Sequence, residues 1–251
     1  MSTTQFWPGL AAPLFNAMAL LLALAFHRNR AAMVLALLTL VSLGLSGLGD
    51  PRLDERGAEA ARMFAPWLLL WAAAMPERRL FARRNLVLLG LLAVSTWLTL
   101  DAPAHLWPGM RALLPLGWLS WKSGLVAAGI VLTAALLCLW RWLRLRTSME
   151  FSLGLILLIV GVALLPQVPD TAKSSLLTLC GVLALLAILH ASYRMAFVDG
   201  LAGLPNRRAL DEALARLSGD FALAMVDVDH FKIFNDRNGH AAGDRALISV
   251  A

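Results

Sequence analysis

The chain has 251 residues, of which 59% are hydrophobic and 15% charged, with a net charge of +6 and a mean hydropathy of +0.71. Soluble domains average about 45–50% apolar and about 25% charged residues, so this composition excludes an ordinary soluble protein. No basic stretch carries interleaved aromatic side chains, so the positive charge does not indicate nucleic-acid binding, and we expect no nucleic-acid partner.

The apolar residues form blocks between Leu10 and His190. A helix needs roughly 20 apolar residues to cross a bilayer, so the blocks predict a transmembrane sensor domain over residues 1–190 with about seven helices. Arg62 and Pro76 confine the third block, which leaves six spans as the alternative. The candidate spans are Leu10–Phe26, Ala31–Leu48, Ala61–Met75, Leu86–Leu100, Gly124–Trp140, Phe151–Leu165 and Leu176–His190.

The positive residues predict the orientation, because lysine and arginine collect in cytoplasmic loops. With seven spans, the richer side holds Arg28, Arg30, Arg78, Arg79, Arg83, Arg84, Arg141, Arg144, Arg146 and Arg194. The other side holds Arg52, Arg56, Arg62, Arg111, Lys122 and Lys173. We therefore expect a multi-pass protein of the bacterial inner membrane, with the N-terminus outside and the C-terminus in the cytoplasm. No Asp, Glu, Lys or Arg lies in the middle of a span, which disfavours a coupled transporter, although a transporter-like protein for neutral substrates stays open.

The remaining residues form a linker and a soluble segment. Residues 191–198 continue the last span without proline or glycine, as expected for a signalling helix, and residues 199–251 have ordinary polarity. Apolar and turn-forming residues predict the elements of the segment. These are a turn at Asp199-Gly200, a helix from Pro205 to about Leu217, a strand over Phe221–Val228, a helix from Phe231 to Arg237 and another from about Ala241.

Two carboxylates stand at the end of the predicted strand. Asp227 and Asp229 are two residues apart, so their side chains leave the strand on the same face, and a helix begins directly after them. A helix N-terminus favours phosphate, and carboxylates beside a phosphate favour a divalent cation. The pattern indicates a magnesium–nucleotide site, with a helix cap and a turn aspartate as the alternative.

Two motifs resemble the GGDEF domain of diguanylate cyclases. The first is Asp199, Leu201, Gly203, Leu204, Asn206, Arg207 and Arg208, with Ala202 in place of the usual threonine. The second is Asp227, Asp229, Phe231, Lys232, Asn235, Asp236, Gly239, His240, Gly243 and Asp244. The resemblance implies a polytopic α-helical membrane domain followed by the N-terminal part of an α+β ferredoxin-like, palm-type GGDEF domain.

The resemblance also implies ligands for metal and phosphate. Asp227 would be the catalytic carboxylate and, with the backbone carbonyl of Val228, a ligand of Mg²⁺ or Mn²⁺. The backbone amides around His230, Phe231 and Lys232 would hold the GTP phosphates.

Further roles concern the base and the turns. Asn235 and Asp244 would hydrogen-bond the guanine, and Asp229 would cap the following helix. Gly239, His240 and Gly243 would shape the turn that presents Asp244, and the turn network Asp199, Asn206 and Arg208 would tie the signalling helix to the domain.

The implied activity is condensation of two GTP into cyclic di-GMP by two facing domains, which requires a homodimer. Residues 1–251 contain no Gly-Gly-[Asp/Glu]-Glu-Phe hairpin, which normally supplies a second metal-binding carboxylate, so we expect this chain to be truncated and inactive by itself. The alternative is a non-catalytic membrane signalling or interaction protein that retains a GGDEF remnant.

Overall fold

The computed structural model describes residues 3–45, 65–75, 86–87, 90, 125–165 and 167–251. The chain divides into two compact units, Met1–Ile188 and Leu189–Ala251. The helix α8, Asp170–Phe197, begins in the first unit and ends in the second. Most of the predicted fourth span, Leu86–Leu100, lies outside the described residues, as do parts of the second and third.

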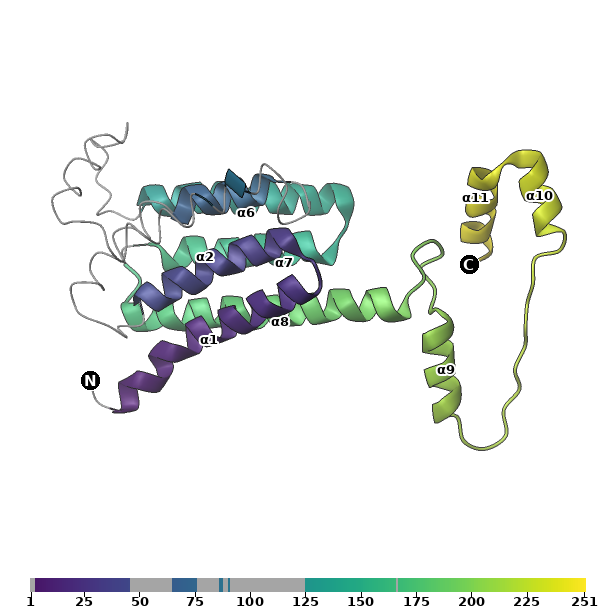
Figure 1. Ribbon diagram of the computed structural model, residues 1–251, viewed down its shortest axis with the longest axis horizontal. Helices are drawn as coiled ribbons and strands as arrows, with labels where there is room; N and C mark the ends of the chain where they lie inside the picture. Colours follow the sequence, from purple (N-terminus) through teal and green to yellow (C-terminus); the bar gives the residue numbers. More distant parts are fainter. Residues whose placement is uncertain (1–2, 46–64, 76–85, 88–89, 91–124, 166) are drawn as a thin grey trace. The chain divides into compact units, whose positions relative to one another are not determined.

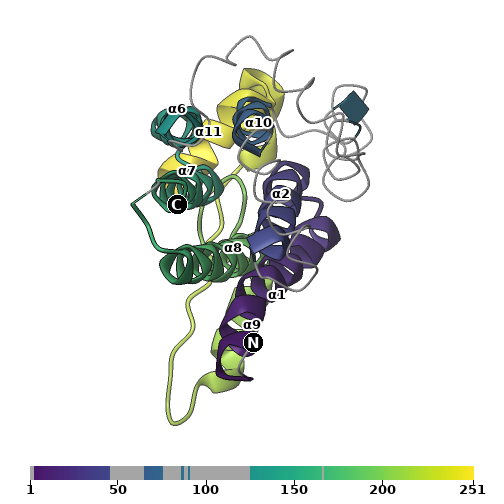
Figure 2. The same ribbon diagram turned by 90° about the vertical axis from the view of Figure 1, so that its left-hand side faces the viewer.

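The first unit is a bundle of apolar helices (Figures 1 and 2). Helices occur where the first, second, fifth, sixth and seventh spans are predicted, and the third coincides with a helix over Ala65–Ala74. Their bounds are α1, Thr3–Ala25; α2, Asn29–Leu45; α6, Leu125–Leu145; α7, Ser148–Ala163; and α8, Asp170–Phe197.

Length and hydropathy qualify two described helices to cross a bilayer, Ala127–Leu145 in α6 and Thr171–Phe197 in α8. Four shorter apolar helices accompany them, Leu10–Ala25, Asn29–Leu43, Ala65–Ala74 and Ser148–Ala163.

Small residues let the helices approach closely. A Cβ at Gly154 of α7 would lie 2.9 Å from the side chain of Leu139 in α6, and one at Gly161 would lie 3.2 Å from Leu132. The two glycines are seven residues apart, so they share one face of α7, and that face packs on α6. Close packing of this kind increases the van der Waals contact between the two helices.

The interface between α1 and α8 combines a glycine with a buried amide. Gly181 of α8 faces the backbone of Phe15 and Asn16, which a Cβ would approach to 2.8 Å. Asn16 is fully buried, and its Nδ2 donates to the carbonyl oxygens of Ala12, at 2.7 Å, and Leu177, at 3.1 Å. The bond to Leu177 joins α1 to α8.

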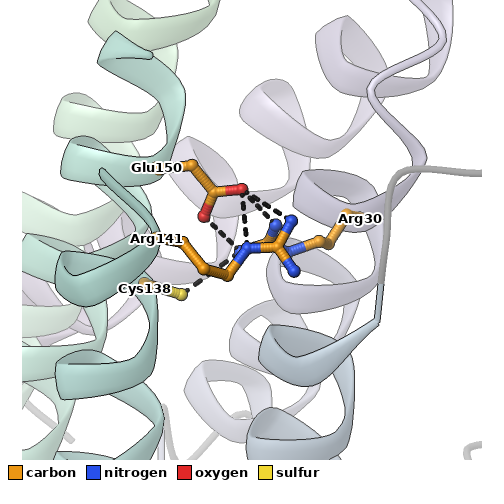
Figure 3. Close-up of polar contacts among 4 residues, drawn as sticks. All are labelled: Arg30, Cys138, Arg141 and Glu150. Atoms are coloured by element: carbon orange, nitrogen blue, oxygen red, sulfur yellow. Dashed lines mark hydrogen bonds and ion pairs between the residues drawn. The ribbon is translucent and has the colours of Figure 1, made fainter. Parts of the chain in front are cut away.

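A buried ion-pair cluster joins three helices of the bundle (Figure 3). The carboxylate of Glu150, in the first turn of α7, accepts hydrogen bonds from both Nη atoms of Arg30, at the start of α2. Arg141, near the end of α6, donates to the same carboxylate with Nη2 at 3.1 Å and Nε at 3.2 Å. The thiol of Cys138 lies 3.3 Å from Nη2 of Arg30. The α1–α2 and α6–α7 connections therefore lie at the same end of the bundle.

The second unit contains the end of α8 and three short helices, α9, Arg207–Arg216; α10, Phe231–Asn238; and α11, His240–Val250. Each lies where a helix is predicted. The predicted strand over Phe221–Val228 is wrong for the described residues, because this segment pairs with no other part of them. A strand is held by hydrogen bonds to a neighbouring strand, so a segment with a strand-like sequence forms no strand without such a neighbour. Met225 and Val226 are 93% and 84% exposed as a result.

The ferredoxin-like sheet is therefore not present among the described residues, and the structure corresponds to a predominantly helical chain. The one bridge between extended residues that it records pairs Val198 with Pro205.

Candidate functional site

The turn after α8 is organised by Asp199. Its Oδ1 accepts hydrogen bonds from the backbone N–H groups of Leu201, at 2.9 Å, and Ala202, at 2.8 Å. These two donors favour the ionised carboxylate and lower the pKa of Asp199 below its usual value. The backbone N–H of Asp199 donates to the carbonyl of Leu204 at 2.8 Å, which closes the turn. Gly203 adopts the left-handed conformation, with φ of +72°, that this turn requires.

Asn206 connects the turn to both neighbouring helices. Its side-chain oxygen accepts from the backbone N–H of Ala209 at 3.2 Å, which makes it the N-cap of α9. Its Nδ2 donates to the carbonyl of Ala196 in the last turn of α8 at 2.8 Å. One side chain therefore ties the end of α8 to the start of α9, while Arg208 lies exposed in the first turn of α9.

The acidic end of the predicted strand is exposed. Oδ1 of Asp227 accepts from the backbone N–H of Val228 at 2.9 Å. The expectation that Asp229 caps α10 is wrong, because the N-cap is His230, in the left-handed conformation with φ of +53°, and no side chain caps the helix. The left-handed conformation of His230 turns the chain into α10.

The first turn of α10 presents free backbone donors. The first intrahelical bond runs from the N–H of Phe234 to the carbonyl of His230 at 3.0 Å. The preceding N–H groups of Phe231 and Lys232 have no intrahelical acceptor, as at every helix start, and the helix dipole adds positive potential there. This is the arrangement that binds phosphate oxygens.

Asn235 lies where α10 and α11 meet. It projects from α10 onto Gly243 of α11, and a Cβ on Gly243 would lie 1.7 Å from Oδ1 of Asn235. Asp244 follows Gly243 directly and is exposed. The expectation for Gly243 changes accordingly, since it is a helical, buried residue that supports Asn235, whereas Gly239, with φ of +82°, makes the break between the helices. The sequence marked Gly243 as a motif residue but gave no sign of what it contacts.

The residues present fit part of a magnesium site. The carboxylate of Asp227 and the carbonyl of Val228 are oxygen donors, which Mg²⁺ prefers, and Mg²⁺ usually completes its coordination with water and substrate phosphate. Asp227 is exposed, so its second oxygen is accessible. Among the described residues, no three His, Cys, Asp or Glu side chains gather as a metal cluster.

Residues 196–251 match the sequence family described as "Diguanylate cyclase, GGDEF domain". A diguanylate cyclase, DgcP, of Pseudomonas aeruginosa is 49% identical over 25% of this chain and 10% of its own length. Diguanylate cyclase DgcP of Escherichia coli is 47% identical over 22% of this chain and 18% of its own. A cyclic di-GMP phosphodiesterase, PdeB, of Shewanella oneidensis is 40% identical over 25% of this chain and 8% of its own.

The match thus spans a small part of the relatives' length, and no solved structure matches the chain. Within the matched segment, the turn of Asp199, the start of α10 and the contact of Asn235 with Gly243 all fall on motif positions. Residues 196–251 are therefore GGDEF-domain sequence of the diguanylate cyclase family.

Proposed function

We propose that this chain is the membrane region and first catalytic segment of a diguanylate cyclase, which converts two GTP into cyclic di-GMP and two diphosphates. The observation that carries the proposal is the array of groups along one short stretch. The stretch begins with the carboxylate of Asp227 and continues with the start of α10, where backbone N–H groups have no intrahelical acceptor. It ends with an amide and a carboxylate, those of Asn235 and Asp244.

Each group has a role in holding GTP. The N–H groups of Phe231 and Lys232 bind phosphate oxygens at the start of α10. Asn235 and Asp244 hydrogen-bond the guanine edge. Bound by Asp227 and the carbonyl of Val228, Mg²⁺ or Mn²⁺ would neutralise phosphate charge and lower the pKa of the attacking hydroxyl.

The reaction itself requires two bound GTP molecules. The 3′-oxygen of each forms a bond to the α-phosphorus of the other, the bond from each of these phosphorus atoms to its bridging oxygen breaks, and two diphosphates leave with the electron pairs. The hydroxyl proton passes to solvent. One site holds one GTP, so two copies of the domain face each other, and the active form is a homodimer.

The polypeptide of residues 1–251 is inactive by itself in this proposal, because a hairpin with the second metal-binding carboxylate is not among these residues. Incubation of the purified polypeptide with GTP and Mg²⁺, followed by chromatography of the products, tests this. Formation of cyclic di-GMP above a no-enzyme control would refute it. In the full-length protein that contains these residues, turnover is expected, and its absence would refute the cyclase assignment.

The proposed location is the bacterial inner membrane, with the bundle spanning it several times. The apolar helices of the first unit support this, and GTP is a cytosolic substrate, so residues 199–251 face the cytoplasm. Seven spans then place the N-terminus outside. Reporter fusions after Thr4, Arg56 and Arg84 test the arrangement, and a cytoplasmic signal at Thr4 would contradict seven spans.

The second candidate is a non-catalytic membrane signalling or interaction protein with a GGDEF remnant. The match to a protein named as a phosphodiesterase favours it, because similar segments occur in proteins named for another activity. Specific GTP binding without turnover in the full-length protein would select this candidate.

A further inference from the structure

Gly243 is the fourth residue of a helix, and its backbone conformation does not require glycine. It lies in α11, His240–Val250, and does not have the positive φ that Gly203, Gly219 and Gly239 show. Alanine forms helices better than glycine, so glycine weakens α11 at this position. Its lack of a side chain must serve a contact.

That contact is with the amide of Asn235. The position that a Cβ of Gly243 would occupy is 1.7 Å from Oδ1, 2.8 Å from Cγ and 3.1 Å from Nδ2 of Asn235. Atoms that are not bonded cannot approach so closely, so any larger residue at 243 displaces the amide. Gly243 is also the one buried residue of α11, which agrees with an amide seated on it.

The amide has a defined orientation. Its oxygen is the atom nearest Gly243, and this oxygen is buried without a hydrogen-bond partner among the described residues. An oxygen can be accommodated on a glycine because Cα–H groups are weak donors, whereas an inward NH₂ group would bury two donors that Gly243 cannot satisfy. The NH₂ group is therefore the end that α10 offers to a ligand.

We propose that Gly243 is a positioning residue that sets the base specificity of the site by fixing the Asn235 amide with its oxygen inward and its NH₂ group outward. The inference rests on the proposed function, in which Asn235 contacts guanine. Guanine presents the acceptors O6 and N7 on its edge, whereas adenine presents a donor beside N7. If the amide oxygen cannot turn outward, the NH₂ group donates to an acceptor of guanine. With adenine, the same NH₂ group faces the adenine amino group, so that two donors oppose each other.

The test compares GTP and ATP binding to the full-length protein in lipid nanodiscs by calorimetry with Mg²⁺. Gly243→Ala is expected to weaken GTP binding by about tenfold or more, the equivalent of one hydrogen bond, and to reduce the preference for GTP over ATP. Helix content by circular dichroism should not fall, because alanine favours the helix. Gly200→Ala is the matched control, since nothing lies within 4 Å of a Cβ at Gly200.

A double-mutant cycle separates positioning from other effects. In an Asn235→Ala background, Gly243→Ala should change GTP binding by less than about twofold, because the displaced amide is already absent. If Gly243→Ala alone unfolds the domain through the clash, the double variant should regain helix content.

Each contrary result has a distinct meaning. A wild-type protein with no preference for GTP over ATP would refute the proposed function and this inference with it. A wild-type preference that Gly243→Ala retains would refute the positioning role alone. An equal loss from Gly243→Ala with and without Asn235 would also refute it, because the glycine would then act through another contact.

Discussion

Replacement of Glu150 by glutamine should destabilise the helix bundle strongly. The carboxylate of Glu150 receives both Nη atoms of Arg30, one of them at 2.6 Å, and Nη2 of Arg141 at 3.1 Å. The side chains of Arg30 and Glu150 are 2% and 9% exposed. Glutamine keeps the shape but removes the charge, so the two guanidinium groups lose the carboxylate that they share.

The expected cost is about 3–5 kcal/mol, the usual effect of removing one partner of a buried ion pair. The corresponding fall in Tm is roughly 10 °C. Both cysteines are free and buried, so a thiol-reactive fluorophore that labels them on heating reports unfolding of the bundle in detergent. We expect labelling of Glu150→Gln to begin at a correspondingly lower temperature than labelling of the wild type.

Two controls make the measurement specific. Glu212→Gln breaks an exposed ion pair, in which the side chains of Glu212 and Arg216 are 53% and 79% exposed. This variant should leave the labelling curve unchanged, because such helix pairs contribute only about 0.3–0.5 kcal/mol. Arg30→Met combined with Glu150→Leu removes the two most buried charges and should recover most of the loss, because the remaining Arg141 is partly exposed. A Glu150→Gln protein that melts with the wild type would show that the cluster does not hold the helices together.

Three further outcomes are expected in the second unit. Asp227→Ala in the full-length protein should abolish cyclic di-GMP formation without loss of helix content, because it removes the exposed carboxylate proposed to bind the metal ion; near-normal turnover would exclude this role. Asn206→Ala should destabilise α9 by about 0.5–2 kcal/mol through loss of its N-cap, seen as faster amide hydrogen exchange in α9, whereas unchanged exchange would deny the cap. The pKa of Asp199 is lowered, so its carboxylate stabilises the turn above the usual aspartate pKa of about 3.9, and this contribution is lost as the pH falls through the pKa of the folded state. The amide NMR shifts of Leu201 and Ala202 should therefore titrate with a midpoint below about pH 3.9. A midpoint above that pH would contradict the two hydrogen bonds.

The helices of the bundle could be predicted because their signal is local. A block of apolar residues long enough for a membrane helix needs no knowledge of its partners, and α1, α2, α6, α7 and α8 all lie on such blocks. The helix ends of the second unit are equally local, since the Asn206 oxygen caps α9 through Ala209, three residues on, and the N–H of Gly239 donates to Asn235, four residues before it.

The features that sequence reasoning missed depend on residues distant in the chain. Glu150 and Arg30 each stand one residue outside a predicted span, and nothing in either block indicates that the two would meet 120 positions apart. The segment Phe221–Val228 has a strand's composition, yet a strand is a property of a pair. The same holds for Gly243, whose purpose is visible only from the position of Asn235.

The uninterrupted course of α8 has a mechanical consequence. Its 28 residues contain no proline and extend about 42 Å at 1.5 Å per residue, which exceeds the roughly 30 Å of a bilayer's hydrocarbon layer. A rod of this kind does not absorb a disturbance by bending at a joint; it passes on rotation, tilt or axial displacement from one end to the other. Each residue also advances a helix by about 100°, so the number of residues in α8 sets the angle between side chains at its two ends.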